Sequence, residues 1–137
     1  MKLVSFNFTK INVEKFSDSL KDLKINTGID ISDIKVVKSD FLKLNGDLIA
    51  VKFNYNISYE DKIAKLEFAG NMLVSVESKV SKEVLKKWED KKMPEEFKLN
   101  IFNIILKKAS LKAILFEEEF NLPLHIPLPS IKSQEKT

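Results

Sequence analysis

The sequence predicts an α+β fold, in which an antiparallel four-stranded sheet is followed by a short helix and one long helix. Three observations support this prediction. Apolar and polar residues alternate through most of the first half of the chain, as in strands with one covered face. The apolar spacing then changes to three and four residues, as in helices. The length of 137 residues suits one domain with a hydrophobic core.

The first strand is expected to bulge or bend near Thr9 and Lys10, because the apolar positions change parity there. The residues on the two sides of this change are Val4, Phe6 and Phe8, then Ile11 and Val13. Residues 16–28 are polar and contain turn formers, which predicts a loop. A second strand is expected over residues 29–44, broken or bent near Ser39 and Asp40.

Asn45 and Gly46 predict a tight type I′ hairpin, because both residues tolerate positive φ. The third strand is expected to cover one face, which consists of Val51, Phe53, Tyr55, Ile57 and Tyr59. A turn at Glu60 and Asp61 leads to a fourth strand over residues 63–76. Its covered face is predicted to contain Ala64, Leu66, Phe68, Met72, Val74 and Val76. Gly70 interrupts this strand, as at a bulge or a close approach of two segments.

Two helices are expected to follow the strands. Ser81 is predicted to cap a short helix over residues 82–90, with Val84, Leu85 and Trp88 pointing inward. The long helix is predicted from Met93 to Asn121, because Pro94 suits a first turn and Pro123 disfavours helical geometry before it. Its main apolar stripe is predicted to be Leu99, Phe102, Leu106, Ala109, Ala113, Phe116 and Phe120.

The long helix is expected to be covered twice, because it is apolar on nearly all sides and a surface helix needs only one apolar face. We expect its own sheet to cover one side and a second copy of the chain to cover another. The predicted contact residues between copies are Phe102, Leu106, Ala109 and Ala113. A monomer would leave a large apolar patch in water, so a dimer or a dimer of dimers is predicted.

The composition is ordinary for a globular protein, with 44% hydrophobic and 31% charged residues. No apolar run reaches the length of a membrane span, and the first residues lead directly into a strand pattern without the features of a signal peptide. The chain contains no cysteine. A cytoplasmic location is therefore expected.

The residue inventory argues against catalysis. All 23 basic residues are lysines, there is one histidine, and three glycines cannot build a phosphate-binding loop. His125 is expected to be exposed or to have a packing role, because a general base needs a positioned partner. Glu117, Glu118 and Glu119 project from different sides of a helix and are expected to be solvated. We therefore expect no enzyme activity, no cofactor and no metal.

Two sets of residues could either bind nucleic acid or have a structural role. Phe53, Tyr55 and Tyr59 could stack on bases, although such a face is more often the core side of a sheet. Lysines concentrate between Lys79 and Lys92 and could contact phosphates. The net charge of only +3 and the absence of arginine make nucleic acid an improbable partner.

Local strings in the chain resemble the SecB family of export chaperones. Phe8–Glu14 is similar to the family's first-strand run, and Leu48–Ile57 looks like its long alternating strand. Glu67–Leu73 resembles the glycine-marked strand before the first helix, and Asn121–Pro123 is similar to the run by which the family leaves its long helix. The strings occur in the family's order over residues 5–127. The resemblance implies a single SecB-like domain over 1–129. Residues 130–137 are polar and are expected to form a flexible tail.

The chain departs from the family in two respects. The family continues into a second helix that walls the client-binding groove, whereas this sequence has a proline-rich segment. The export members are acidic and use acidic surface to meet the translocation motor, whereas this chain is slightly basic. The resemblance therefore implies chaperone action but not docking to that motor. SecB-like chaperones outside the export pathway fit the charge better.

The resemblance implies an ATP-independent chaperone that binds unfolded or precursor polypeptides through apolar grooves, with a connection to protein export. The expected client contacts are Trp88, Met93 and Phe97, with Tyr55 and Tyr59 from the sheet. The alternative for each is a place in the core, because large apolar residues are usually buried. The alternative function is a small oligomeric interaction or regulatory module with one specific protein partner.

Overall fold

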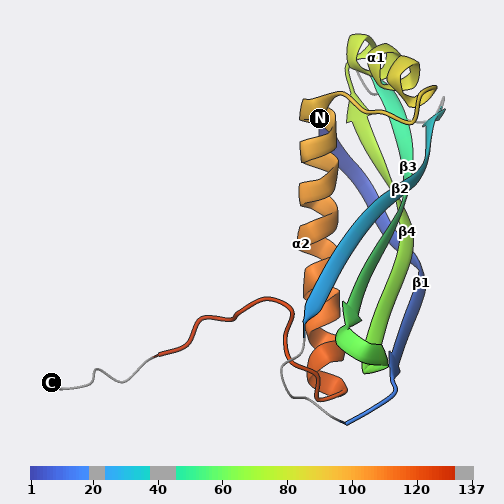
Figure 1. Ribbon diagram of the computed structural model, residues 1–137. Helices are drawn as coiled ribbons and strands as arrows, with labels where there is room; N and C mark the ends of the chain where they lie inside the picture. Colours follow the sequence, from blue (N-terminus) through green and yellow to red (C-terminus); the bar gives the residue numbers. More distant parts are fainter. Residues whose placement is uncertain (19–23, 38–45, 132–137) are drawn as a thin grey trace, which may run out of the picture.

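The computed structural model describes residues 1–18, 24–37 and 46–131. In these residues the chain forms the strands β1 (Lys2–Lys15), β2 (Ile25–Val37), β3 (Asp47–Tyr59) and β4 (Ala64–Val76), the short 3₁₀ turn η1 (Glu60–Lys62), and the helices α1 (Ser78–Trp88) and α2 (Glu95–Glu119). The strands pair antiparallel in the order β1-β4-β3-β2. The predicted α+β fold is confirmed. Helix α2 lies along one face of the twisted sheet and α1 caps one end (Figure 1).

The two central strands have one buried face, as their alternating sequence predicts. In β3 the odd-numbered residues from Ile49 to Tyr59 are buried, and in β4 the even-numbered residues from Ala64 to Val76 are buried. The opposite face carries Lys52, Asn54, Asn56 and Ser58, which are exposed. The core of the protein therefore lies between this sheet face and α2.

The predicted bulge in β1 is confirmed. The pairing register of β1 and β4 shifts between Phe8 and Lys10, and a second shift lies between Leu3 and Ser5. Strand β2 has a similar shift between Ile31 and Asp33, opposite β3. That shift was not predicted, although its apolar positions also change parity, from Ile29 and Ile31 to Ile34 and Val36. An extra residue in a strand turns every later side chain to the other face.

The boundaries of β2 differ from the prediction. Residues 25–28 belong to the strand and pair with Tyr59 to Asn56 of β3, so the predicted loop over residues 16–28 is too long. Turn-forming residues such as Asn26 and Gly28 are accommodated because the partner strand supplies the pairing. The proposed break at Ser39 and Asp40, and Asn45 of the predicted hairpin, lie outside the described residues.

Two glycines are required by close contacts. Gly46 has φ of 146°, and a side chain there would meet the carbonyl oxygen of Val76 at 2.3 Å. At Gly70 an added Cβ would lie 2.2 Å from the carbonyl oxygen of Asn7 and 2.8 Å from the ring of Phe53. The close approach predicted at Gly70 is confirmed, and it lets the Phe53 ring lie across β4.

Helix α1 starts earlier than predicted. Its first residue is Ser78, and Ser81 is buried inside the helix, where its hydroxyl contacts the Asp47 carboxylate and the Ser78 carbonyl. Ser81 therefore joins α1 to the start of β3 and is not the cap. The helix packs on β2 and β3 with Val84 buried, whereas Leu85, expected to point inward, is exposed.

Helix α2 buries a different stripe from the predicted one. Every fourth residue is fully or nearly fully buried, in the series Phe97, Ile101, Ile105, Ala109, Ala113 and Glu117. Because a helix has 3.6 residues per turn, this row advances about 40° at each step and winds around the helix. The predicted stripe shares only Ala109 and Ala113 with this row; Leu99 and Leu106 point to solvent.

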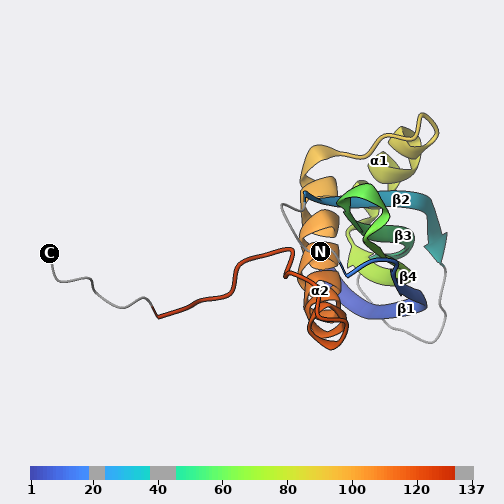
Figure 2. The ribbon, with the colours of Figure 1, turned by 60° about the horizontal axis from the view of Figure 1, so that its bottom comes forward.

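Asn121 ends α2 in the left-handed conformation, with φ of 54°. The Leu122 amide donates to the Glu117 carbonyl at 2.8 Å, which is the pairing of a Schellman C-terminal motif. The Lys15 ammonium donates to the Phe120 carbonyl at 2.9 Å and fixes this end of the helix to β1. The chain then turns back along α2 (Figure 2).

Candidate functional site

Three of the predicted client contacts are core residues in this structure. Tyr55 and Tyr59 lie on the inner face of β3 and are almost completely buried, and Phe97 begins the buried row of α2. Their side chains face the protein's own sheet or helix. A client could not contact them without opening the space between α2 and the sheet.

A buried polar cluster connects β3, the end of α2 and the segment that follows it. We call it the exit cluster, and it consists of Tyr55, Tyr59, Ser110, Glu117 and His125. The side chains of His125 and Glu117 are 2% and 0% exposed. The imidazole Nδ1 lies 2.8 Å from the Glu117 carboxylate, and Nε2 lies 3.1 Å from the Tyr55 hydroxyl.

The tyrosines of the exit cluster hold the chain that leaves α2. The Tyr59 hydroxyl contacts both the Glu117 carboxylate, at 2.6 Å, and the Pro123 carbonyl, at 2.5 Å. The Tyr55 hydroxyl also lies 3.3 Å from the Ser110 hydroxyl. The His125 amide donates to Glu117 as well, at 3.3 Å, and Leu122 is buried. Residues 122–125 are therefore anchored between β3 and α2.

The electrostatic environment keeps both phenols protonated. Burial raises the pKa of Tyr55, and the Glu117 charge raises it further, against a lowering by the bond to Ser110. Burial also raises the pKa of Tyr59 far above its usual range, reinforced by the hydrogen bond to Glu117 and by the charges of Glu117 and Tyr55. Each phenol therefore remains a neutral hydrogen-bonding group at physiological pH.

Glu117 does not have the solvated position predicted for it. It occupies the end of the buried row of α2, while its neighbours Glu118 and Glu119 are exposed. Its position could have been inferred from the sequence, because Glu117 continues the four-residue spacing of that row. On β3, Tyr55 and Tyr59 show the same spacing and could offer it hydroxyl groups. His125 lies in the core, so its role is in packing and not at the surface. Its positioned partner, Glu117, was not predicted.

The exit cluster has the order of groups seen in nucleophilic catalysis, a hydroxyl beside an imidazole beside a carboxylate. Here both the imidazole and the carboxylate are closed off from solvent. All the polar atoms of these side chains have protein partners. The arrangement is therefore suited to holding the exit segment in place rather than to meeting a substrate.

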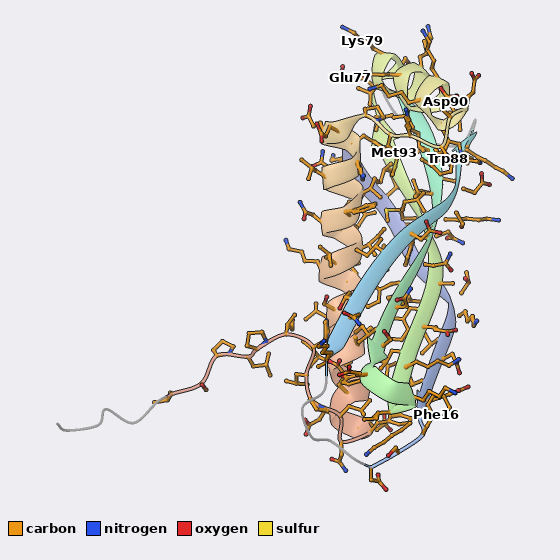
Figure 3. All side chains as sticks on the ribbon, in the orientation of Figure 1. Phe16, Glu77, Lys79, Trp88, Asp90 and Met93 are labelled. Carbon is orange, nitrogen blue, oxygen red and sulfur yellow. The ribbon has the colours of Figure 1, made fainter. Side chains whose placement is uncertain are left out.

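Trp88 and Met93 are the predicted client contacts that keep access to solvent. Both are half-buried against the core beneath α1, at the opposite end of the molecule from the exit cluster (Figure 3). Leu85, on the preceding turn of α1, is 39% exposed. The Lys91 ammonium lies 4.8 Å from the centre of the Trp88 ring, in a cation–π contact. This end thus offers apolar side chains bordered by lysines.

The four predicted contact residues between copies divide into two pairs. Ala109 and Ala113 are completely buried against the protein's own sheet, so they cannot contact a second copy from this position. Phe102 is half-buried, and Leu106 is 41% exposed, with Leu99 beside them at 61%. The outer surface formed by Leu99, Phe102 and Leu106 is called the upper row below.

A second outward surface on α2 was not singled out from the sequence. Leu111 and Leu115 are 67% and 64% exposed, one turn apart, and we call them the lower row. Leu111 lies about 140° around the helix from Leu106, because five residues separate them. The two rows therefore face different neighbours. Strand β1 adds exposed Leu3, Val4 and Ile11 to the apolar surface.

The described residues hold no group of three or more histidine, aspartate or glutamate side chains placed to bind a metal ion. Among these residues, no helix combines the length and the apolar character needed to cross a membrane. The lysines of α1 and the turn after it are exposed on the outer side of the helix, where Lys87 pairs with Glu83 at 3.9 Å.

Comparison with known proteins gives one structural likeness. No protein-family model and no curated protein matches the sequence. The fold is similar to that of the Mycobacterium tuberculosis Rv1957 SecB-like chaperone, with 10% identity, a TM-score of 0.42, and coverage of 98% of this chain and 92% of the other. That chaperone was solved in complex with a ChAD peptide from the Rv1956 HigA1 antitoxin. The likeness concerns the fold, and no residue of this chain takes a role from it.

Proposed function

We propose that the protein is an ATP-independent, cytoplasmic chaperone that binds unfolded polypeptides, as the sequence resemblance to the SecB family implies. The observation that carries the proposal is the apolar surface left uncovered on a folded domain. At the α1 end, Leu85 is exposed, and Trp88 and Met93 are half-buried and keep access to solvent. Apolar side chains gathered at one end in this way are typical of an interaction surface.

This surface suits many clients because apolar contact has no directional requirement. Lysines border it at the α1 end and would keep the free protein soluble. Strands β1 and β2 are the outer strands of the described sheet, so each has a backbone edge to which an extended chain could pair. Pairing of this kind is also independent of client sequence.

The test is suppression of aggregation of two unrelated unfolded proteins without ATP. The double substitution Leu85→Ser with Met93→Ser should reduce protection of both clients, because it removes apolar contact area at the α1 end. A matched control, Lys82→Ser with Lys86→Ser, changes exposed residues of the same helix and should keep most of the protection. Circular dichroism checks that both variants are folded.

The alternative is an interaction module with one partner, and the same assay separates it from a chaperone. If the unaltered protein protects neither client, the chaperone proposal is rejected and the single-partner module takes its place. If it protects both but the two variants behave alike, the α1 end is not the client-binding surface.

We also infer that the upper row packs against a second copy, giving a dimer or a dimer of dimers. The support is the exposure of Leu99 and Leu106 beside half-buried Phe102. The change Leu106→Asp should shift sedimentation towards the monomer without loss of helix content. An unchanged oligomer would exclude this row from the interface.

A further inference from the structure

The segment that follows α2 has no charged residues, and its second part is exposed to solvent. From Phe120 to Ile131 the sequence contains no lysine, aspartate or glutamate, and no other uncharged run in the chain is as long. The first part is anchored by the exit cluster. The second part, residues 126–131, is called the arm, and in it Leu128 is 54% and Ile131 102% exposed. An uncharged, apolar segment in water is unfavourable unless something covers it.

The arm is directed away from its own body. Both ribbon views show it leaving the molecule beside the lower half of α2 (Figures 1 and 2). Pro127 and Pro129 fix their own φ and favour an extended backbone in the residue before each. His125 and Leu122 hold its base against β3 and α2. An arm fixed at its base and stiffened by prolines is poorly placed to fold back.

The base of the arm and the lower row lie at the same level of α2. The exit cluster uses Ser110 and Glu117, and between them Leu111 and Leu115 point outward from the helix. A two-fold axis crossing α2 near this level would bring the arm of each copy to the lower row of the other. Such a contact is reciprocal, as a closed dimer requires.

We infer that the arm of one copy packs on the lower row of a second copy, with Leu128 and Ile131 against Leu111 and Leu115. The occupant is a second copy of this chain, because one molecule carries both the exposed apolar arm and the exposed apolar lower row. The contact is separate from the upper row, and it does not depend on chaperone activity. It assigns a role to residues that neither the core nor the exit cluster uses.

Cysteine pairing between copies tests this contact, since the chain contains no cysteine of its own. Chains carrying Leu128→Cys are mixed with chains carrying Leu115→Cys and treated with a mild oxidant. A disulfide-linked pair of the two different chains is expected on a denaturing gel. The matched mixture of Leu128→Cys with Leu99→Cys should give at least tenfold less of that product, because Leu99 lies outside the lower row.

Sedimentation of the full chain provides the second measurement. Leu128→Ser with Ile131→Ser, and separately Leu111→Ser with Leu115→Ser, should each weaken association at least tenfold. Combining all four changes should add little, because both pairs remove one contact. Three outcomes would each overturn the inference. The first is equal cross-linking at Leu99 and Leu115, and the second is association that neither pair of serine changes weakens. The third is a Leu115→Cys/Leu128→Cys chain that cross-links only within itself.

Discussion

Glu117 is the residue on which the exit cluster depends. It receives hydrogen bonds from Tyr59, which is 58 positions away on β3, and from His125 in the exit segment that follows α2. A buried carboxylate is stabilised when several donors form hydrogen bonds to it. Without the carboxylate, the donors that depend on it would be buried without an acceptor, which costs free energy. The cluster therefore joins sheet, helix and exit segment through a single side chain.

We predict that Glu117→Ala destabilises the protein by about 1–3 kcal/mol, because the buried imidazole of His125 loses its partner and Tyr59 keeps only the Pro123 carbonyl. The matched change Glu118→Ala, at the exposed neighbouring position, should stay within about 0.5 kcal/mol of the unaltered protein. Urea unfolding followed by circular dichroism measures both. Equal stability of the two variants would show that Glu117 is not essential to the cluster.

The buried tyrosines also predict a pH dependence on the alkaline side. Their pKa values are raised in the folded state, so the folded protein holds these protons more tightly than the unfolded chain does. Their contribution is fully present below the ordinary tyrosine pKa of about 10 and is lost as the pH rises towards the folded values.

Denaturation measured between neutral pH and pH values above about 10 should therefore show falling stability, together with the appearance of tyrosinate absorbance. In Tyr59→Phe the baseline stability is lower, but the additional alkaline loss should be smaller. If Tyr59→Phe loses stability with rising pH as steeply as the unaltered protein does, the loss comes from other groups, such as the lysines.

Sequence reasoning succeeded where one face of an element is apolar and the other polar. In β3 and β4 strict alternation has only one reading, so the buried faces were predicted correctly. Helix α2 is apolar on several sides, and several stripes fit the spacing equally well. Periodicity could not choose among them. The polar residue Glu117 at the end of the true row made it look less apolar than its competitors.

The exit cluster was beyond prediction for a related reason. His125 is separated from Tyr55 by 70 positions, and their contact depends on how the chain turns after Asn121. Local patterns predict the helix end at Pro123 but not the direction taken afterwards. Among the client contacts, Trp88 and Met93 keep access to solvent, whereas the pattern alone could not distinguish them from core residues.

Ala109 and Ala113 mark where α2 must carry small side chains against the sheet. Both are completely buried between larger residues of the same row. We predict that Ala113→Leu costs about 1–3 kcal/mol, because the added methylenes have no space. The matched change Leu111→Ala, on the outer side, should leave the stability of the dissociated chain nearly unaltered. Thermal melts at low protein concentration measure both, and a harmless Ala113→Leu would indicate spare room there.

The whole molecule is organised around one core. Among the described residues, Leu122 is the last buried residue along the chain, and His125 is the last residue that contacts the exit cluster. The tail predicted from Ser130 adds no described contact to that core. We predict that a chain ending at Pro129 keeps its Tm when measured dilute enough to exclude association. A drop of several degrees under those conditions would show that the tail packs on its own domain.

The positions of the aromatic residues also provide optical labels at both ends of the molecule. The chain has one tryptophan and two tyrosines. Trp88 lies at the α1 end, and both tyrosines belong to the exit cluster at the other end. Fluorescence of the indole and absorbance of the phenols therefore follow separate regions without any added dye. If the two signals change at the same denaturant concentration, α1 and the exit cluster unfold as one cooperative unit. If they separate, one end can open while the other remains intact.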